Sequence, residues 1–89
     1  MASYALIKFK INKDFFDWEQ AFYSSQPMAR QAGIVELFHG RTDDDSQTCF
    51  VLAQVSSKEA MDKFFAEARD SIASSGHILE STKVTMLNN

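Results

Sequence analysis

The sequence predicts an α+β fold in which one antiparallel sheet of four strands packs against two helices. Three observations support this prediction. Residues 48–55, T-C-F-V-L-A-Q-V, hold an unbroken apolar run between polar flanks, which is typical of a central strand buried on both faces. Residues 4–11 alternate with a period of two, as a strand with one apolar face does. Two amphipathic stretches separate the strands, which gives the order strand, helix, strand, strand, helix, strand.

The first helix is predicted to follow the strand at 4–11, with Asn12 or Asp14 as its N-cap. Aromatic residues spaced i, i+3 and i+7 then form a stripe, which is typical of a helix face buried in the core: Phe15, Trp18 and Phe22. Pro27 removes a backbone donor, so we expect the helix to end or kink there. Gly33 is a natural stop before the strand at 34–41.

The second helix is predicted to begin at a capping box, with Ser56 at the N-cap and Glu59 three residues later. Its apolar stripe comprises Met61, Phe64, Phe65, Ala68 and Ile72. The turn-forming residues 42–47 join the strands at 34–41 and 48–55 and are few enough for a hairpin. A last strand is predicted at 82–87.

This order is the ferredoxin-like β-α-β-β-α-β pattern, and right-handed crossovers place both helices on one face of the sheet. We expect the strand order 4-1-3-2 in a single domain spanning residues 1–89. The other face would carry an apolar patch of a kind that is rare on monomers. The sequence therefore predicts a homodimer, stacked sheet to sheet about a twofold axis, with this interface: Tyr4, Leu6, Phe50 and Leu52.

Composition excludes several classes of function. The net charge is −3 and the basic residues form no block, so no nucleic-acid partner is expected. No apolar stretch approaches the ~20 residues that span a bilayer, and no charged segment followed by an apolar one marks a signal peptide. We therefore expect a cytoplasmic protein without a membrane partner. Cys49 is the only cysteine, which leaves no intramolecular disulfide.

Two histidines are the main candidates for chemistry. His39 lies late in the strand at 34–41, on the face that regular alternation shares with Val35 and Leu37. It suits a general base in a pocket, and it equally suits a strand-end histidine bonded to a carbonyl. His77 follows a predicted helix C-terminus, where an imidazolium would cap the helix dipole. Because no ligand-type spacing links them to the single cysteine, we expect no metal and no cofactor.

The chain resembles the dimeric α+β barrel superfamily, which includes antibiotic-biosynthesis-type monooxygenases, stress-responsive barrel proteins and small uncharacterised bacterial families. The resemblance spans residues 4–87 and rests on element order, on the aromatic helix at 15–23, on Ala-Gly-Ile at 32–34 and on residues 75–84. It implies an apolar pocket beside the sheet. The residues that we assign to that pocket are Trp18, Phe22, His39 and His77.

The chain departs from two patterns of that superfamily. Many of its monooxygenases carry a tryptophan where the third strand meets the second helix, but this chain has Val55-Ser56-Ser57 there. Its haem-degrading branch uses an Asn, a Trp and a His on specific elements, and the single Trp18 does not reproduce that set. Our first hypothesis is therefore an uncharacterised homodimeric barrel that binds a small apolar or aromatic ligand. The alternative is a cofactor-independent monooxygenase-like enzyme for a small aromatic or quinol-type substrate, with His39 as its polar group.

Overall fold

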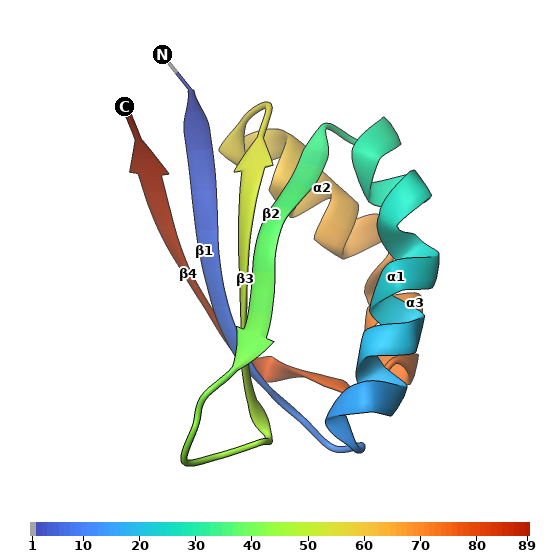
Figure 1. The fold of residues 1–89 in the computed structure, drawn as a ribbon. Helices are drawn as coiled ribbons and strands as arrows, with labels where there is room; N and C mark the ends of the chain where they lie inside the picture. Colours follow the sequence, from blue (N-terminus) through green and yellow to red (C-terminus); the bar gives the residue numbers. More distant parts are fainter. Residues whose placement is uncertain (1) are drawn as a thin grey trace.

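The structure is a computed structural model that describes residues 2–89. Its fold is one antiparallel sheet with helices on a single face (Figure 1). Its elements follow along the chain as β1 (Ser3–Ile11), α1 (Phe15–Gln31), β2 (Ile34–Arg41), β3 (Thr48–Val55), α2 (Lys58–Glu67), α3 (Arg69–Ser74) and β4 (His77–Asn88). The four strands lie in the order β2-β3-β1-β4, which confirms the predicted fold class and strand order. None of the helices within residues 2–89 has the length and apolar character needed to cross a membrane.

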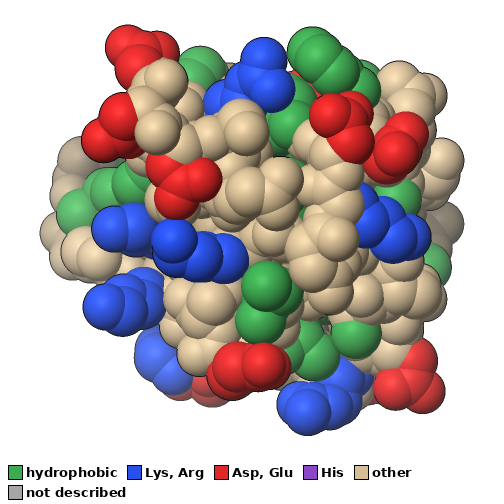
Figure 2. Space-filling model, turned by 90° about the horizontal axis from the view of Figure 1, so that it is seen from below, with side chains coloured by type: hydrophobic (Ala, Val, Ile, Leu, Met, Phe, Trp, Pro, Cys, Tyr) green, Lys and Arg blue, Asp and Glu red, His purple; other side chains and the backbone are tan. Residues whose placement is uncertain are grey.

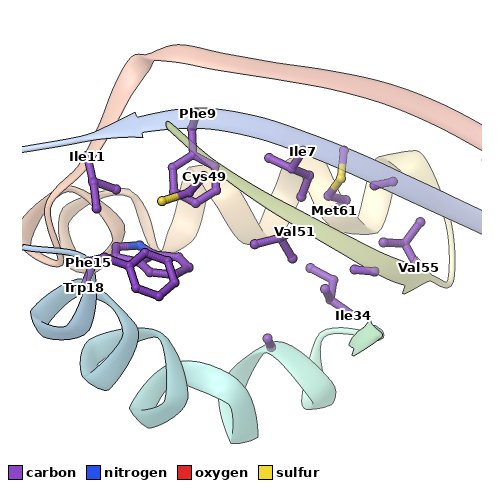
Figure 3. Packing of buried hydrophobic residues seen from close by; sticks show 13 residues of the cluster. Ile7, Phe9, Ile11, Phe15, Trp18, Ile34, Cys49, Val51, Val55 and Met61 are labelled. Atoms are coloured by element: carbon purple, nitrogen blue, oxygen red, sulfur yellow. The ribbon is translucent and has the colours of Figure 1, made fainter. Parts of the chain in front are cut away.

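The core lies between the central strands and the helices. Antiparallel pairing of β1 with β3 sets Ile7 opposite Val51 and Phe9 opposite Cys49, so their side chains share the face that the helices cover. Figure 3 shows Phe15 and Trp18 of α1 reaching up beneath Phe9. Phe9 and Cys49 are almost fully buried, and burial raises the pKa of the Cys49 thiol to about 11. This cysteine is therefore a packing residue.

The first helix begins as predicted and ends later than predicted. Asp14 is its N-cap, and a carboxylate oxygen accepts a hydrogen bond from the backbone N–H of Phe16 at 3.1 Å. Of the two outcomes expected at Pro27, an end or a kink, the end is wrong, because α1 continues through this proline to Gln31. Near the proline, the carbonyl of Phe22 accepts hydrogen bonds from Ser25 Oγ at 2.8 Å and Gln26 Nε2 at 3.1 Å. These side-chain bonds lie just before the carbonyl of Tyr23, which is the group that the missing N–H of Pro27 would have bonded.

The second helical region differs from the prediction in two ways. Its N-cap is Ser57 rather than Ser56, and Ser57 Oγ accepts a hydrogen bond from the N–H of Ala60 at 3.0 Å. The region is also divided at Ala68 into α2 and α3. Residues 2–89 therefore contain three helices, whereas the sequence predicted two. The last strand begins at His77 rather than at residue 82. Its pairing with β1 is interrupted by an irregularity opposite Lys8 and Lys10, so the residues before this point do not continue the alternation of the residues after it. Alternation alone did not reveal the segment before that irregularity.

The loop between β2 and β3 is organised by Asp45. Its carboxylate accepts hydrogen bonds from Thr48 Oγ1 at 2.8 Å and Gln47 N at 2.9 Å, and it pairs with Lys10 Nζ at 3.2 Å. The bond from Thr48 is the main cause that lowers the pKa of Asp45. Figure 2 looks at the end of the molecule that holds this loop and shows acidic and basic side chains interspersed. This end therefore presents no continuous field of one sign.

The sheet face opposite the helices is uncovered within one chain (Figure 1). The pairing of β1 with β3 places Tyr4, Leu6, Phe50 and Leu52 on this open face, and each is only half-buried. The prediction that the central strand is buried on both faces is thus wrong for a single chain. Three further side chains on the open face are exposed, Val35, Leu87 and Phe38, the last at 60%.

His77 is part of the core and not the helix-capping imidazolium that the sequence suggested. Its ring stacks on Phe9 with centroids 3.9 Å apart and planes within 4°, and Nε2 lies 2.6 Å from Thr82 Oγ1. Burial lowers the pKa of His77 to about 4. The earlier interpretation failed because the residue after Gly76 turns inward and pairs with Ile11 as the first residue of β4.

The buried His77 should make stability depend on pH. Between pH 6.5 and about 4, an unfolded chain binds a proton at His77 while the folded chain does not, so the free energy of unfolding falls as the pH falls. The loss should reach on the order of 3 kcal/mol near pH 4. Urea denaturation at intervals from pH 7 to 4.5 measures it, and His77→Gln should show a clearly shallower decline. Equal slopes in the two proteins would contradict this assignment.

Candidate functional site

A cavity of about 500 Å³ lies between the sheet and the helices. Its floor is formed by β1, β2 and β3, and its walls come from α1 on one side and from α2 and α3 on the other. Exposed serines from both walls line it, which places the mouth between α1 and α3: Ser24, Ser71 and Ser74. Ligand pockets in proteins commonly have volumes of ~300–1,000 Å³, so a small organic molecule fits this space.

The cavity has a continuous aromatic wall. Trp18 stacks on Phe22 with centroids 4.9 Å apart at 23°, and its other side meets Phe9 at 5.4 Å. Phe9 in turn stacks on His77, and Phe65 meets the edge of the His77 ring at 6.3 Å. All five rings line the cavity. Such a wall offers ring edges and the ring faces not covered by a neighbouring ring for packing against another aromatic ring.

Small residues create the empty space beside that wall. Ala53 of β3 lies on the floor at the centre of the sheet, and its neighbour across β1 is Ala5; both are completely buried. Ala21 and Ala29 of α1 and Ala68 at the α2–α3 junction line the walls. Because alanine side chains are short, the helices and the sheet cannot fill the volume between them at these positions.

A cluster of titratable side chains stands at the edge of this cavity. His39 Nε2 lies 2.6 Å from Glu19 Oε2, and His39 Nδ1 lies 3.1 Å from Glu36 Oε1. The side chains are largely shielded, with exposed fractions of 14% for His39, 18% for Glu19 and 22% for Glu36. Glu36 lines the cavity directly, whereas His39 lies behind it and against the ring of Phe22 at 5.0 Å.

Tyr23 closes the outer side of this cluster. Its hydroxyl donates to Glu19 Oε2 at 3.2 Å and lies 3.4 Å from His39 Nε2. Desolvation by its neighbours, followed by the hydrogen bond to Glu19, raises the pKa of Tyr23 above its ordinary value. The tyrosine ring also meets the His39 ring edge to face at 5.4 Å. Glu19 and the imidazole are therefore each held by more than one partner, whereas Glu36 is held by His39 alone.

A β-bulge brings the cluster together. Glu36 pairs with Ala53 and Phe38 pairs with Leu52, so β2 contains one extra residue, Leu37, at this point. In a regular strand, residues three apart point to opposite faces, but the extra residue puts Glu36 and His39 on the same, helix-covered face. The expectation that His39 shares a face with Val35 and Leu37 is therefore wrong. The adjacent apolar residues Leu37 and Phe38, which break the alternation, were the signal for this bulge.

Three of the four residues that the sequence assigned to the pocket line the cavity, and the fourth does not. Trp18, Phe22 and His77 line the cavity, and His39 stands one residue behind its wall. Sequence reasoning missed Glu36 and Glu19, because neither belongs to a recognised motif and they come together only through the bulge and the packing of α1 on β2. Within residues 2–89, no group of three or more His, Cys, Asp or Glu side chains is arranged to hold a metal ion.

Solved structures with the same fold include several monooxygenases. A protein from Bordetella bronchiseptica that is described as a candidate antibiotic biosynthesis monooxygenase matches with a TM-score of 0.75 at 13% identity, over 100% of this chain and 98% of that one. A variant of SnoaB, a cofactor-independent oxygenase from Streptomyces nogalater, matches with a TM-score of 0.69 at 14% identity, over 99% and 92%. A Streptomyces coelicolor monooxygenase in complex with nanaomycin D matches with a TM-score of 0.64 at 16% identity, over 99% and 87%. At these identities the similarity establishes the antibiotic-biosynthesis-monooxygenase-like fold.

Sequence comparison adds a family and no activity. A search of curated proteins returns no match. One family model, described as a domain of unknown function, matches residues 2–89 and so covers nearly the whole chain. The chain belongs to this family, DUF3764.

Proposed function

We propose that this protein binds a small aromatic ligand in the cavity between its sheet and its helices. The observation that supports the proposal best is the row of rings from Phe22 through Trp18 and Phe9 to His77 along one wall. A flat aromatic molecule stacked on this row would bury apolar surface on both partners, at roughly 25 cal/mol per Å². The nanaomycin D complex of a protein with this fold is consistent with such a ligand.

Trp18 provides a direct test because it is the only tryptophan in the sequence and lines the cavity. We expect 2-naphthol to shift the single indole N–H peak in a ¹H–¹⁵N NMR titration. Ala21→Phe should weaken binding about tenfold or more, since the new ring occupies the cavity. Gln20→Phe places the same ring on the exposed side of the same helix and should leave binding unchanged. Failure of 2-naphthol and related arenes to move the indole peak would refute the proposal.

A second candidate function is a cofactor-independent oxygenase reaction on a quinol-type substrate. It is favoured by the Glu36 carboxylate at the edge of an aromatic cavity, where it would accept a phenolic proton, and by the oxygenase SnoaB among the proteins that share the fold. We expect oxygen uptake with 1,4-dihydroxynaphthalene to exceed the rate in buffer, and Glu36→Gln to remove the excess. Uptake equal to the buffer rate would leave ligand binding as the function.

We further propose that two copies of the chain associate through the open face. The pairing of strands brings Leu6, Leu52, Phe38 and Phe50 together on one surface that no helix or strand within residues 2–89 covers. Burying even ~500 Å² of apolar surface per copy is worth on the order of 12 kcal/mol, against association costs of ~4–15 kcal/mol. Lys8 and Lys83 lie opposite each other at one end of this face, so a twofold axis near Leu6 and Leu52 keeps the lysines of the two copies apart.

Sedimentation velocity at micromolar concentration tests the association. The native protein should sediment as a dimer, and Leu52→Lys should shift it towards the monomer, because a charge buried in the interface would lack a partner. Ala66→Lys adds the same charge on the exposed side of α2 and should leave the dimer intact. A native protein that sediments as a monomer would overturn the proposal.

A further inference from the structure

We propose that Glu36 selects the ligand of the cavity by accepting a hydrogen bond from a hydroxyl or amino group on the aromatic ring, and that His39 and Glu19 hold Glu36 in position. The inference rests on the proposed ligand binding, because it names the polar group that such a ligand would carry. It assigns Glu36 as the specificity-determining residue and His39 as a positioning residue.

Glu36 has one carboxylate oxygen free for a ligand. Its place opposite Ala53 puts it on the cavity side of β2, where it lines the empty space. Oε1 is engaged by His39 Nδ1 at 3.1 Å, while the second oxygen makes no hydrogen bond to any residue in 2–89. A hydrogen bond to a carboxylate oxygen contributes more free energy in a largely apolar, partly shielded space than in water. It is also stronger than a hydrogen bond between neutral groups, because the acceptor is charged.

His39 is fixed on the side away from the cavity. The 2.6 Å contact with Glu19 anchors Nε2, and the rings of Phe22 and Tyr23 pack against the imidazole with centroids 5.0 and 5.4 Å away. Because the ring cannot easily turn, the contact at Nδ1 restrains the Glu36 carboxylate as well. His39 does not line the cavity, so its influence on a ligand acts through Glu36.

Most of the other polar side chains of the cavity already have hydrogen-bond partners. His77 Nε2 is paired with Thr82 Oγ1, and the face of its ring is covered by Phe9. Four of the five wall serines donate to carbonyls of their own helices: Ser24 to Gln20, Ser25 to Phe22, Ser74 to Ser71 and Ser75 to Ile72. The hydroxyl of the fifth, Ser71, makes no hydrogen bond within residues 2–89. Among the described lining residues Glu36 carries the one carboxylate, so its free oxygen is the strongest hydrogen-bond acceptor that the cavity offers a ligand.

This arrangement predicts an order among three ligands of the same ring size. In 2-naphthol the hydroxyl donates to Glu36, in 2-methoxynaphthalene the donor is replaced by an ether, and 2-naphthoate brings a negative charge towards the carboxylate. Followed by the Trp18 indole peak, 2-naphthol should bind about tenfold or more tightly than the ether, and 2-naphthoate should bind most weakly. Glu36→Leu should bring the naphthol-to-ether ratio close to one without weakening the ether.

A matched pair of variants tests the positioning role of His39. In His39→Asn, the side-chain amide can donate to Glu36 in place of Nδ1, so the naphthol-to-ether ratio should persist. In His39→Leu, a side chain of similar size offers no donor, and the ratio should fall while the affinity for the ether stays the same. A merely structural role would instead change the affinities for both ligands together.

The outcomes separate this inference from the function on which it rests. Equal affinities of the native protein for 2-naphthol and 2-methoxynaphthalene would overturn the role of Glu36 and leave aromatic binding in place. A ratio that survives Glu36→Leu would also overturn it. If neither ligand moves the indole peak, the proposed function fails and the selection by Glu36 fails with it.

Discussion

The pairing of β1 with β3 is the constraint on which the rest of the structure depends. It aligns Ala5 with Ala53, Ile7 with Val51 and Phe9 with Cys49 on one face, and Leu6 with Leu52 on the other. A slip of one residue would exchange the two faces and bury lysines under the helices. The same register therefore fixes the core, the floor of the cavity and the apolar surface of the open face.

Local departures from regular structure, in contrast, create the candidate site. The extra residue in β2 turns Glu36 and His39 to the same side, where α1 presents Glu19 to them. Two carboxylates that flank one imidazole are more costly to shield from water than an apolar packing of the same volume. Bulges often re-aim side chains near functional sites, and this one brings His39 to the face where Glu36 already lines the cavity.

Sequence reasoning could predict the fold because the fold is determined by patterns that repeat along whole strands and helices. The alternation in β1 and the aromatic stripe of α1 repeat over many residues, so single irregularities do not hide them. The site depends on features one residue long, which averaging over a window removes. The bulge at Leu37 reversed the predicted face of His39, and the turn at Gly76 moved His77 from a helix end into the core. Glu19 and Glu36 are 17 positions apart, and only tertiary packing brings them to one imidazole.

Two largely apolar surfaces of the chain, the cavity and the open sheet face, are incompletely packed within one copy. A chain of this length buries only about 60–65% of its unfolded surface, and its core is thin. Yet it leaves both a cavity and a sheet face unpacked, and neither stabilises a lone copy. On β3, Ala53 points into the cavity and its neighbour Leu52 points to the open face, so one strand separates the two surfaces. Occupants that bind only the folded chain would stabilise it by mass action, so the ligand and the second copy that we propose would each add to the stability of so small a core.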